Sequence, residues 1–402
     1  MVRHTDPAAL RRRLIRYWFA PLPEPPAALR RGPLRDGAIP AGRRSTALTS
    51  RLGVLLGVAF AVCFLTGLLS HLIQHPPGWF WWPARPVRLY QVTQGVHVAT
   101  GLASVPLLGA KLWSVYPRLF AWPPARTVAH AAERAGVAVL VAAALFQVLS
   151  GILNIARWYA PMPFFFTAGH YWVGWLVAGA LLVHLGVQLP VVRTALARPR
   201  TASPDRRELL LGAGAAAGLI TLLTVGQTVR PLAPVALLAP RRPGTGPQGL
   251  PVNRTAAAAD VQGVAADAYR LVIVGPAGER SLGLAALAAL PQHTAVLPIT
   301  CVEGWSSTAT WTGVRLRDLV ALAGADPARS TVEVESLQAT GRYRASTVDP
   351  AHTRDPLTLI ALRIGGETLH PDHGYPARLI APNRPGVLQT KWVGRITVRE
   401  ER

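Results

Sequence analysis

The sequence predicts an N-terminal all-α bundle of five membrane-spanning helices followed by a C-terminal α+β domain. The first half of the 402-residue chain contains long apolar runs that are poor in charged residues. Residues 269–398 instead alternate short apolar strands with short amphipathic helices. The chain has only two cysteines, Cys63 and Cys301, which excludes a disulfide framework, a zinc finger and an all-cysteine iron–sulfur cluster.

The chain is strongly basic, with 42 Lys and Arg against 20 Asp and Glu and a net charge of +22. Such a charge on a soluble protein would favour nucleic-acid binding. Here the basic residues cluster at the ends of the apolar runs, so we expect no nucleic-acid partner. Residues 1–50 are basic and Pro-rich, which predicts a mobile cytoplasmic tail without a packed core.

Each predicted span is long enough to cross a bilayer core of about 30 Å at about 1.5 Å per residue. Residues 51–192 would hold the first four spans and residues 203–229 the fifth. The apolar runs are Leu52–Ile73, Leu89–Trp113, Ala135–Ile155, Tyr171–Val192 and Leu209–Val229.

The distribution of basic residues predicts the membrane topology. The N-terminal tail and the loops after spans 2 and 4 are rich in arginine, so they are expected on the cytoplasmic side. The loops after spans 1 and 3 carry few basic residues and are expected outside, where residues 79–82 (WFWW) would form an interfacial aromatic belt. Five spans then place everything after about residue 230 on the outer side.

Four histidines lie in the predicted spans: His71, His97, His170 and His184. Titratable rings in hydrocarbon are costly and usually face a bundle interior or a cofactor. His170 and His184 are 14 residues apart, which puts them on one helix face about 21 Å apart along the axis. This spacing suits two haems stacked across a bilayer, and interhelical hydrogen bonding is the alternative.

Residues 47–195 resemble the membrane cytochrome b subunits of formate dehydrogenases and hydrogenases. The resemblance rests on GVHVATG at 95–101 and HYWVGWLVAGALLVH at 170–184. It implies one or two haem b groups, with His97, His170 and His184 at ligand positions. His71 lies near the outer end of its span, whereas the family ligand lies near the inner end, so the pairing of the histidines stays open.

A twin arginine, Arg206-Arg207, precedes the Ala- and Gly-rich fifth span and resembles a twin-arginine export signal. A basic flank of an ordinary span is the alternative. The arrangement resembles hybrid membrane proteins of actinobacteria, in which the last span uses a different export machinery. Residues 230–250 are rich in proline and glycine and predict a linker before a domain at 251–402.

The C-terminal domain is predicted to contain strands at 269–274, 331–337 and 358–369 and a helix at 282–290. Residues 297–324 read as a strand, then a loop with Cys301 and two tryptophans, then an amphipathic helix. A lone cysteine at a strand end suits a nucleophile or a metal ligand, or else a buried structural thiol.

Four motifs in order give this domain its resemblance to the sulfite oxidase family of molybdenum enzymes: TCVEGWS at 300–306, TWTGVRLRDLV at 310–320, HPDHGYPARLI at 370–380 and KWVGRI at 391–396. The resemblance implies an α+β molybdopterin-binding fold in which Cys301 is the thiolate ligand of molybdenum. Positions implied to bind the pterin or its phosphate are Asn253, Ser336, His373, Arg378, Gln389, Thr390 and Lys391. The substrate pocket of the family is not identifiable, and Arg342, Tyr343 and Arg344 are nearby candidates.

Together the two resemblances imply a molybdopterin-dependent oxidoreductase in a bacterial cell membrane. It would transfer an oxygen atom to or from a small oxyanion, S-oxide or N-oxide, and its N-terminus would be cytoplasmic and its catalytic domain outside. Electrons would pass through haem b to or from a quinone or another carrier. The alternatives are a molybdenum domain on a haem-free anchor with a separate redox partner, and a metal-free binding module.

Overall fold

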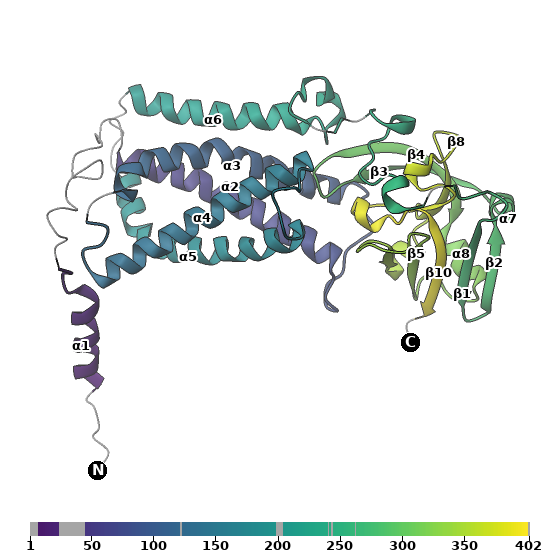
Figure 1. Cartoon of the computed structure of the whole chain (residues 1–402), viewed down its shortest axis with the longest axis horizontal. Helices are drawn as coiled ribbons and strands as arrows, with labels where there is room; N and C mark the ends of the chain where they lie inside the picture. The colour runs from purple at the N-terminus through teal and green to yellow at the C-terminus, as the bar shows by residue number, and fades with distance from the viewer. Residues whose placement is uncertain are drawn as a thin grey trace, which may run out of the picture. The chain divides into compact units, whose positions relative to one another are not determined.

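The computed structural model describes residues 7–23, 45–120, 123–197, 204–239, 241–242, 244–261 and 263–400. The chain divides into two compact units, which are treated separately below (Figure 1). One unit comprises Met1–Phe64 and Thr100–Thr221, and the other comprises Leu65–Ala99 and Leu222–Arg402. The division crosses three long helices, so it does not follow the domain boundaries expected from the sequence.

The basic tail contains a helix, α1 (Pro7–Phe19). Its apolar side chains, including Leu14, Tyr17 and Phe19, are exposed. The tail therefore contains a helix that the sequence did not predict. The described side chains of this helix form no apolar core. Residues 1–6 and 24–44 lie outside the described residues.

Five apolar helices are long enough to cross a membrane, which confirms the predicted number of spans within the described residues. Most of them extend beyond their apolar runs, because the polar residues at the ends of a span continue the helix into the interface. The helices are α2 (Thr46–Gln74), α3 (Leu89–Leu119), α4 (Val128–Ala156), α5 (Phe166–Ala197) and α6 (Pro204–Val225).

The fifth helix ends at Val225, four residues before the predicted end at Val229. The chain turns at Gly226, where a Cβ would collide with the backbone of Leu232. The expected linker then begins as a 3₁₀ helix, η2 (Arg230–Val235), and folds back so that Leu238 N donates to Leu223 O at 2.9 Å. A second 3₁₀ turn, η3 (Pro247–Gly249), ends it.

The first compact unit packs around a cluster shared by α2, α3, α4 and α6. It includes Leu52, Leu107, Ala144 and Ala213, all of which are buried. The alanines let the helices approach closely, as is common between membrane helices. Lys111 on α3 donates from Nζ to Thr49 O on α2 at 2.8 Å, so its half-buried ammonium has a polar partner.

The C-terminal part is built on two five-stranded sheets. The first has the order β2-β1-β10-β5-β6, in which β1 pairs with β10 in parallel and the other pairs are antiparallel. Its strands are β1 (Arg270–Gly275), β2 (Gly278–Gly283), β5 (Ser330–Ser336), β6 (Ala345–Val348) and β10 (Val393–Glu400).

The second sheet has the order β3-β4-β7-β8, with β9 also pairing with β7. Figure 1 labels β3, β4 and β8 of this sheet. Its strands are β3 (His293–Thr300), β4 (Ser306–Arg315), β7 (Leu359–Ile364), β8 (Glu367–Thr368) and β9 (Arg378–Ile380). Short helices join the strands, which confirms the α+β class. They are η4 (Ala257–Ala259), α7 (Leu284–Ala289), α8 (Leu316–Leu322), α9 (Pro350–Thr353), η5 (Pro371–His373) and η6 (Gly386–Leu388).

One local prediction is wrong. The loop expected to hold both tryptophans contains only Trp305, because residues 306–315 form β4 and Trp311 is buried in the sheet core. Threonines in the strand alternate with Ala309, Trp311 and Gly313, so it lacks the regular apolar alternation that marks a strand. The predicted strand at 358–369 is two strands, because Gly365 and Gly366 form a hairpin turn at positive φ.

Residues 65–99 belong to the same compact unit as the sheets, and Asn383 explains much of this. Its side chain accepts a hydrogen bond from Tyr90 N at 2.7 Å and donates to Pro83 O at 2.6 Å. Its backbone carbonyl accepts from Trp82 Nε1 at 2.8 Å. The Arg85 guanidinium also pairs with Asp355 at 3.1 Å. The segment between α2 and α3 is thus fixed to the sheet domain by named polar contacts.

Candidate active site

Cys301 follows β3 directly and lies in the tight connection between β3 and β4. The strands pair up to Thr300 and Ser306, whose hydroxyl oxygens are 3.0 Å apart. Between them, Cys301 N donates to Trp305 O at 2.9 Å, and Gly304 N donates to Cys301 O at 3.0 Å. We call residues 301–305 the cysteine loop. It places the thiol at the end of two rigid strands, with 4% of the residue exposed.

The Cys301 sulfur accepts a hydrogen bond from the side chain of Asn253. The distance from Asn253 Nδ2 to Sγ is 2.7 Å, and Trp305 Nε1 donates to Asn253 Oδ1 at 3.1 Å. The indole thus orients the amide so that its NH₂ group faces the sulfur. A donor at this position stabilises a thiolate, which is the form that binds a metal. The structure therefore brings together Asn253 and Cys301, as expected from the sequence.

Arg378 and the segment Gln389–Lys391 also lie together, although β9 and β10 belong to different sheets. Leu379 N donates to Thr390 O at 2.8 Å, which joins the two segments. Gly374 lies between them at φ +108°, where a Cβ would be 3.0 Å from Arg378 Cβ and 3.1 Å from Lys391 Cβ. Glycine is needed here so that the chain carrying His373 can pass so close to both cations.

Arg378 is a buried cation without a carboxylate partner among the described residues. The residue is 2% exposed, and its guanidinium donates to His373 O at 3.0 Å and Gln389 O at 3.3 Å. Burial lowers the pKa of Arg378 to about 9, and its Nε has no hydrogen-bond partner. Buried guanidinium groups normally pair with an anion.

Arg384 is a second buried guanidinium, and the Asp349 carboxylate acts on it. Burial lowers its pKa to about 10, opposed by Asp349, and its Nε also lacks a partner. Gln389 Oε1 is another buried atom without a partner. Two desolvated guanidinium groups and orphaned polar atoms fit a bound group with a phosphate terminus. The residues present therefore suit a phosphate-bearing cofactor.

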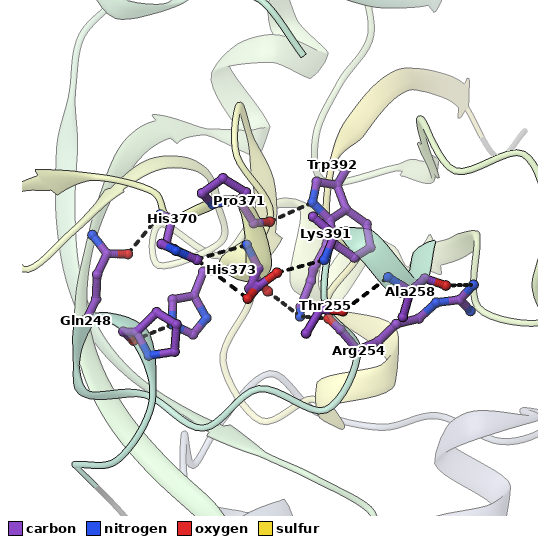
Figure 2. Close-up of polar contacts among 12 residues, drawn as sticks. Gln248, Arg254, Thr255, Ala258, His370, Pro371, His373, Lys391 and Trp392 are labelled. Atoms are coloured by element: carbon purple, nitrogen blue, oxygen red, sulfur yellow. Dashed lines mark hydrogen bonds and ion pairs between the residues drawn. The ribbon is translucent and has the colours of Figure 1, made fainter. Parts of the chain in front are cut away.

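His373 is buried, and its ring faces the chain segment that precedes Asn253. Its Nε2 donates to Pro247 O at 2.6 Å (Figure 2). Burial lowers the pKa of His373 to about 4, so the imidazole is neutral at neutral pH. With the proton on Nε2, Nδ1 is a hydrogen-bond acceptor.

The Lys391 side chain joins its own segment to the segments that contain Arg254 and Asp372. Its Nζ donates to Arg254 O at 3.0 Å and Asp372 O at 2.6 Å, and Figure 2 shows its side chain directed at these carbonyls. The ammonium also lies 5.3 Å from the centre of the Trp392 ring. Among the described residues, no three His, Cys, Asp or Glu side chains form a group that could hold a metal ion.

The other two predicted contact residues lie at the edges of this region. Thr390 Oγ1 is 2.7 Å from Ser346 Oγ on β6. Ser336 ends β5 opposite Val393, and its hydroxyl accepts from Gln338 N at 3.2 Å. Leu337 N donates to Trp392 O at 2.6 Å, so Ser336 adjoins the segment that contains Lys391.

The connection between β5 and β6 brings Tyr343 towards the cysteine loop. Burial raises the pKa of Tyr343, and Cys301 adds to the increase while Arg342 opposes it. Burial and Arg342 lower the pKa of His75, which follows α2. Arg344 instead pairs with Glu335 at 3.8 Å. Of the three pocket candidates, Arg342 and Tyr343 therefore have electrostatic contact with the surroundings of Cys301.

Sequence reasoning missed Gln94 and Arg384. Gln94 on α3 donates from Nε2 to Val302 O of the cysteine loop at 2.8 Å. A glutamine inside a predicted span is costly in lipid. That cost could have indicated that Gln94 has a functional contact. Arg384 lies in an irregular segment before η6, where an arginine is usually a surface charge. The sequence therefore contained no indication that Arg384 is buried at the site.

The four predicted haem histidines divide between the two compact units. In one, His97 Nδ1 is 3.4 Å from Thr66 Oγ1, and its ring lies against Gly67, where a Cβ would be 2.7 Å from Cε1. The rings of His71 and His75 have centroids 4.9 Å apart. In the other unit, His170 Nδ1 is 3.0 Å from Ser150 Oγ, and His184 is partly buried on the same helix.

Comparison with known proteins finds relatives of the C-terminal part. Residues 258–402 match the family model of the oxidoreductase molybdopterin binding domain. Mitochondrial sulfite oxidase of Rattus norvegicus is 32% identical over 162 residues, which is 34% of this chain and 30% of that protein. The chain thus aligns with less than a third of the length of this relative.

A further relative is the putative protein-methionine-sulfoxide reductase subunit YedZ1 of Azospira oryzae. It is 32% identical over 135 residues, covering 33% of this chain and 50% of that protein. Among solved structures, the sulfane dehydrogenase SoxCD from Paracoccus pantotrophus covers 35% of this chain and 40% of its own, with 24% identity and a TM-score of 0.32. That score is too low to establish a common fold.

Proposed function

We propose that this chain, whose residues 258–402 form a molybdopterin-binding oxidoreductase domain of the sulfite oxidase family, is a membrane-bound molybdenum enzyme that transfers an oxygen atom to or from a small substrate. Two observations carry the proposal: the buried Cys301 thiol accepts a hydrogen bond from an amide, and the buried Arg378 guanidinium has no carboxylate partner among the described residues. The apolar helices would hold it in the membrane.

Each residue of the site has a role in this proposal. Cys301 would ligate molybdenum, and Asn253 would hold the sulfur as a thiolate through its 2.7 Å hydrogen bond. Arg378 would bind the phosphate of the cofactor, together with the segment Gln389–Lys391. His373, which is neutral, would accept a hydrogen bond at Nδ1, and Ser336 would lie at the edge of the pterin. The bound cofactor supplies two-electron oxygen-atom transfer.

The substrate would be a small oxyanion, an S-oxide or an N-oxide. Arg342 and Tyr343 are the groups that would receive it, because both interact with the surroundings of Cys301. A guanidinium recognises an oxyanion, and a phenol can donate to the oxygen of an S-oxide or N-oxide.

The membrane helices would carry haem b, with electrons passing to or from a quinone or another carrier. His97 and His170 support this role because a hydroxyl engages Nδ1 of each ring. An axial histidine normally has one nitrogen held by such a partner and binds iron through the other. His71 and His184 would be further ligands if two haems bind.

The same hydroxyl contacts favour a second candidate. Thr66 and Ser150 also satisfy the imidazoles as ordinary interhelical hydrogen bonds. The helices would then be a haem-free anchor, and a separate protein would exchange electrons with molybdenum. A metal-free binding module is a weaker proposal, because it gives no reason for the hydrogen bond between Asn253 and the thiol.

Two sets of contacts support the proposed topology, in which the N-terminus is cytoplasmic and the catalytic domain is outside. Leu22 N of the tail donates to Arg126 O in the loop after span 2 at 2.8 Å, and this contact supports a common side for the two basic segments. The segment after span 1 contacts the sheet domain through the ion pair of Arg85 with Asp355, as expected if both lie on the other side. Arg206-Arg207 at the start of α6 would direct twin-arginine export in a bacterium.

Substitution of Cys301 tests the proposal directly. Cys301→Ser should abolish turnover of sulfite, dimethyl sulfoxide and trimethylamine N-oxide with artificial redox dyes while the protein stays folded. Cys63→Ser is the matched control, since Cys63 is the other cysteine and lies in α2. Unchanged turnover in Cys301→Ser would refute the role of the thiolate.

A spectrum separates the two membrane candidates. A dithionite-reduced minus oxidised visible spectrum of the purified chain, with haem quantified per chain, should show a b-type signal if the helices carry haem. The absence of that signal in molybdenum-loaded protein would favour the haem-free anchor.

A further inference from the structure

The cysteine loop is held from outside its own domain by residues of the membrane helices. These residues lie in two places: on α3, and in the turn that follows α6. All of them belong to the same compact unit as Cys301. The sheets fix the two ends of the loop, at Thr300 and Ser306, whereas the helices contact its middle.

The first contact comes from α3. Gln94 is 3% exposed, and its Nε2 donates to Val302 O, the carbonyl of the residue after Cys301, at 2.8 Å. Gln94 Oε1 lies 3.5 Å from the hydroxyl of Tyr90, which is itself 3.0 Å from Ser70 Oγ on α2. The amide is therefore fixed at both ends, and the hydrogen bond to Val302 joins the loop to both helices.

The second contact comes from the turn after α6. Thr228 Oγ1 donates to Gly304 O, and Gln227 O accepts from Ser306 N at 2.8 Å. Gln91 on α3 donates from Nε2 to Thr228 O at 3.2 Å, so the turn is itself held by α3.

Gly304 shows how tightly this arrangement packs. Its φ is +96°, and a Cβ there would lie 2.6 Å from Val98 Cγ2 and 3.2 Å from Gln227 Nε2. The backbone of the loop thus approaches α3 to a distance that only glycine allows.

We propose that Gln94 and Thr228 are positioning residues that set the conformation of the cysteine loop, so that the membrane helices form part of the scaffold of the Cys301 site. This inference rests on the proposed role of Cys301 as the molybdenum ligand. Two carbonyls of the loop, those of Val302 and Gly304, depend on these side chains for their hydrogen bonds. Without them the backbone beside Cys301 would reorient to reach other donors, and the sulfur would move with it.

The test uses the full-length chain with Cys63→Ala, so that Cys301 is the only cysteine. The variants are Gln94→Leu and Thr228→Val, each of which removes one donor to the loop. Thr93→Val is the matched control, because among the described residues the Thr93 hydroxyl bonds to Tyr90 O, within α3, and not to the cysteine loop. The first readout is the alkylation rate of Cys301 by iodoacetamide in protein made in a host that lacks molybdopterin. The second is the Mo(V) EPR spectrum of the loaded protein.

We expect each loop variant to react roughly tenfold faster than the control, because losing a buried hydrogen bond raises the open population of the loop by about that factor. We also expect shifted Mo(V) g-values. Using two variants keeps the test decisive if one of them fails to fold. A folded variant whose Cys301 is alkylated at the same rate as in the Thr93→Val control would overturn the proposal. Faster alkylation in protein that never binds molybdenum would support the positioning role and refute the proposed function instead.

Discussion

Arg378→Met should leave the cofactor-free protein nearly as stable as the native chain while removing its ability to retain the cofactor. The reason is the location of Arg378, which is buried against the Trp311 ring and pairs with no carboxylate among the described residues. If the natural counter-ion is the cofactor phosphate, the cofactor-free protein holds an uncompensated charge. Methionine fills a similar volume without that charge.

The size of the effect follows from the lowered pKa. A change from 12.5 to about 9 corresponds to roughly 5 kcal/mol of unfavourable charge burial. The guanidinium is protonated at pH 7 in both folded and unfolded chains, so this cost is fully present there. Losing its hydrogen bonds to His373 O and Gln389 O offsets about 3–6 kcal/mol. The free energy of unfolding should therefore change by no more than about 2 kcal/mol.

The assay compares thermal unfolding of the solubilised, cofactor-free protein with the molybdenum and pterin content of protein made in a competent host. Arg363→Met is the control, because Arg363 is exposed on the adjacent strand β7. A variant that is destabilised by more than about 3 kcal/mol yet binds cofactor normally would refute the reasoning, since a buried ion paired within the protein costs that much to break.

Three further outcomes are expected. Folding lowers the pKa of His373 from 6.5 to about 4. Between these two pH values the unfolded chain binds a proton that the folded chain does not. The free energy of unfolding therefore falls as the pH drops from 6.5 to 4. His373→Gln should make unfolding midpoints in this window less dependent on pH, and an unchanged pH profile would count against a buried neutral ring. Asn383→Ala should lower the free energy of unfolding by about 2–4 kcal/mol and speed hydrogen exchange in residues 83–90, because it leaves Tyr90 N and Pro83 O unpaired. Native-like exchange there would contradict the role of Asn383. Gly304→Ala should cost at least about 2 kcal/mol, and adding Val98→Ala should recover part of the loss; purely additive effects would disprove the close approach.

The sequence was sufficient for features that rest on local patterns. Apolar runs predicted the five long helices, and period-two alternation predicted β1 and β5. The strand β4 was missed because its residues are mostly threonine, serine and glycine, whose burial depends on neighbouring strands rather than on their own hydrophobicity.

The candidate site was predictable only where motif resemblance supplied it. The proximity of Asn253 to Cys301 and of Arg378 to Thr390 follows from that resemblance and is present in the structure. The contacts of Gln94 and Asn383 were not predictable, because single hydrogen bonds between residues more than 200 positions apart leave no periodic trace in a sequence.

The unit that contains Cys301 is assembled from two stretches of chain, Leu65–Ala99 and Leu222–Arg402, which are synthesised far apart in time. Val302, the partner of Gln94, is made 208 residues after it, or roughly 10–40 seconds later, and Asn383 follows Tyr90 by 293 residues. Until then the polar groups of the earlier stretch lack the hydrogen-bond partners that the later stretch supplies. Cutting the gene between α6 and β1 would therefore not yield two self-sufficient products, since each would lack contacts that the other supplies. The polar groups left without partners in such a product would be a physical signal of incompleteness for quality control during biogenesis.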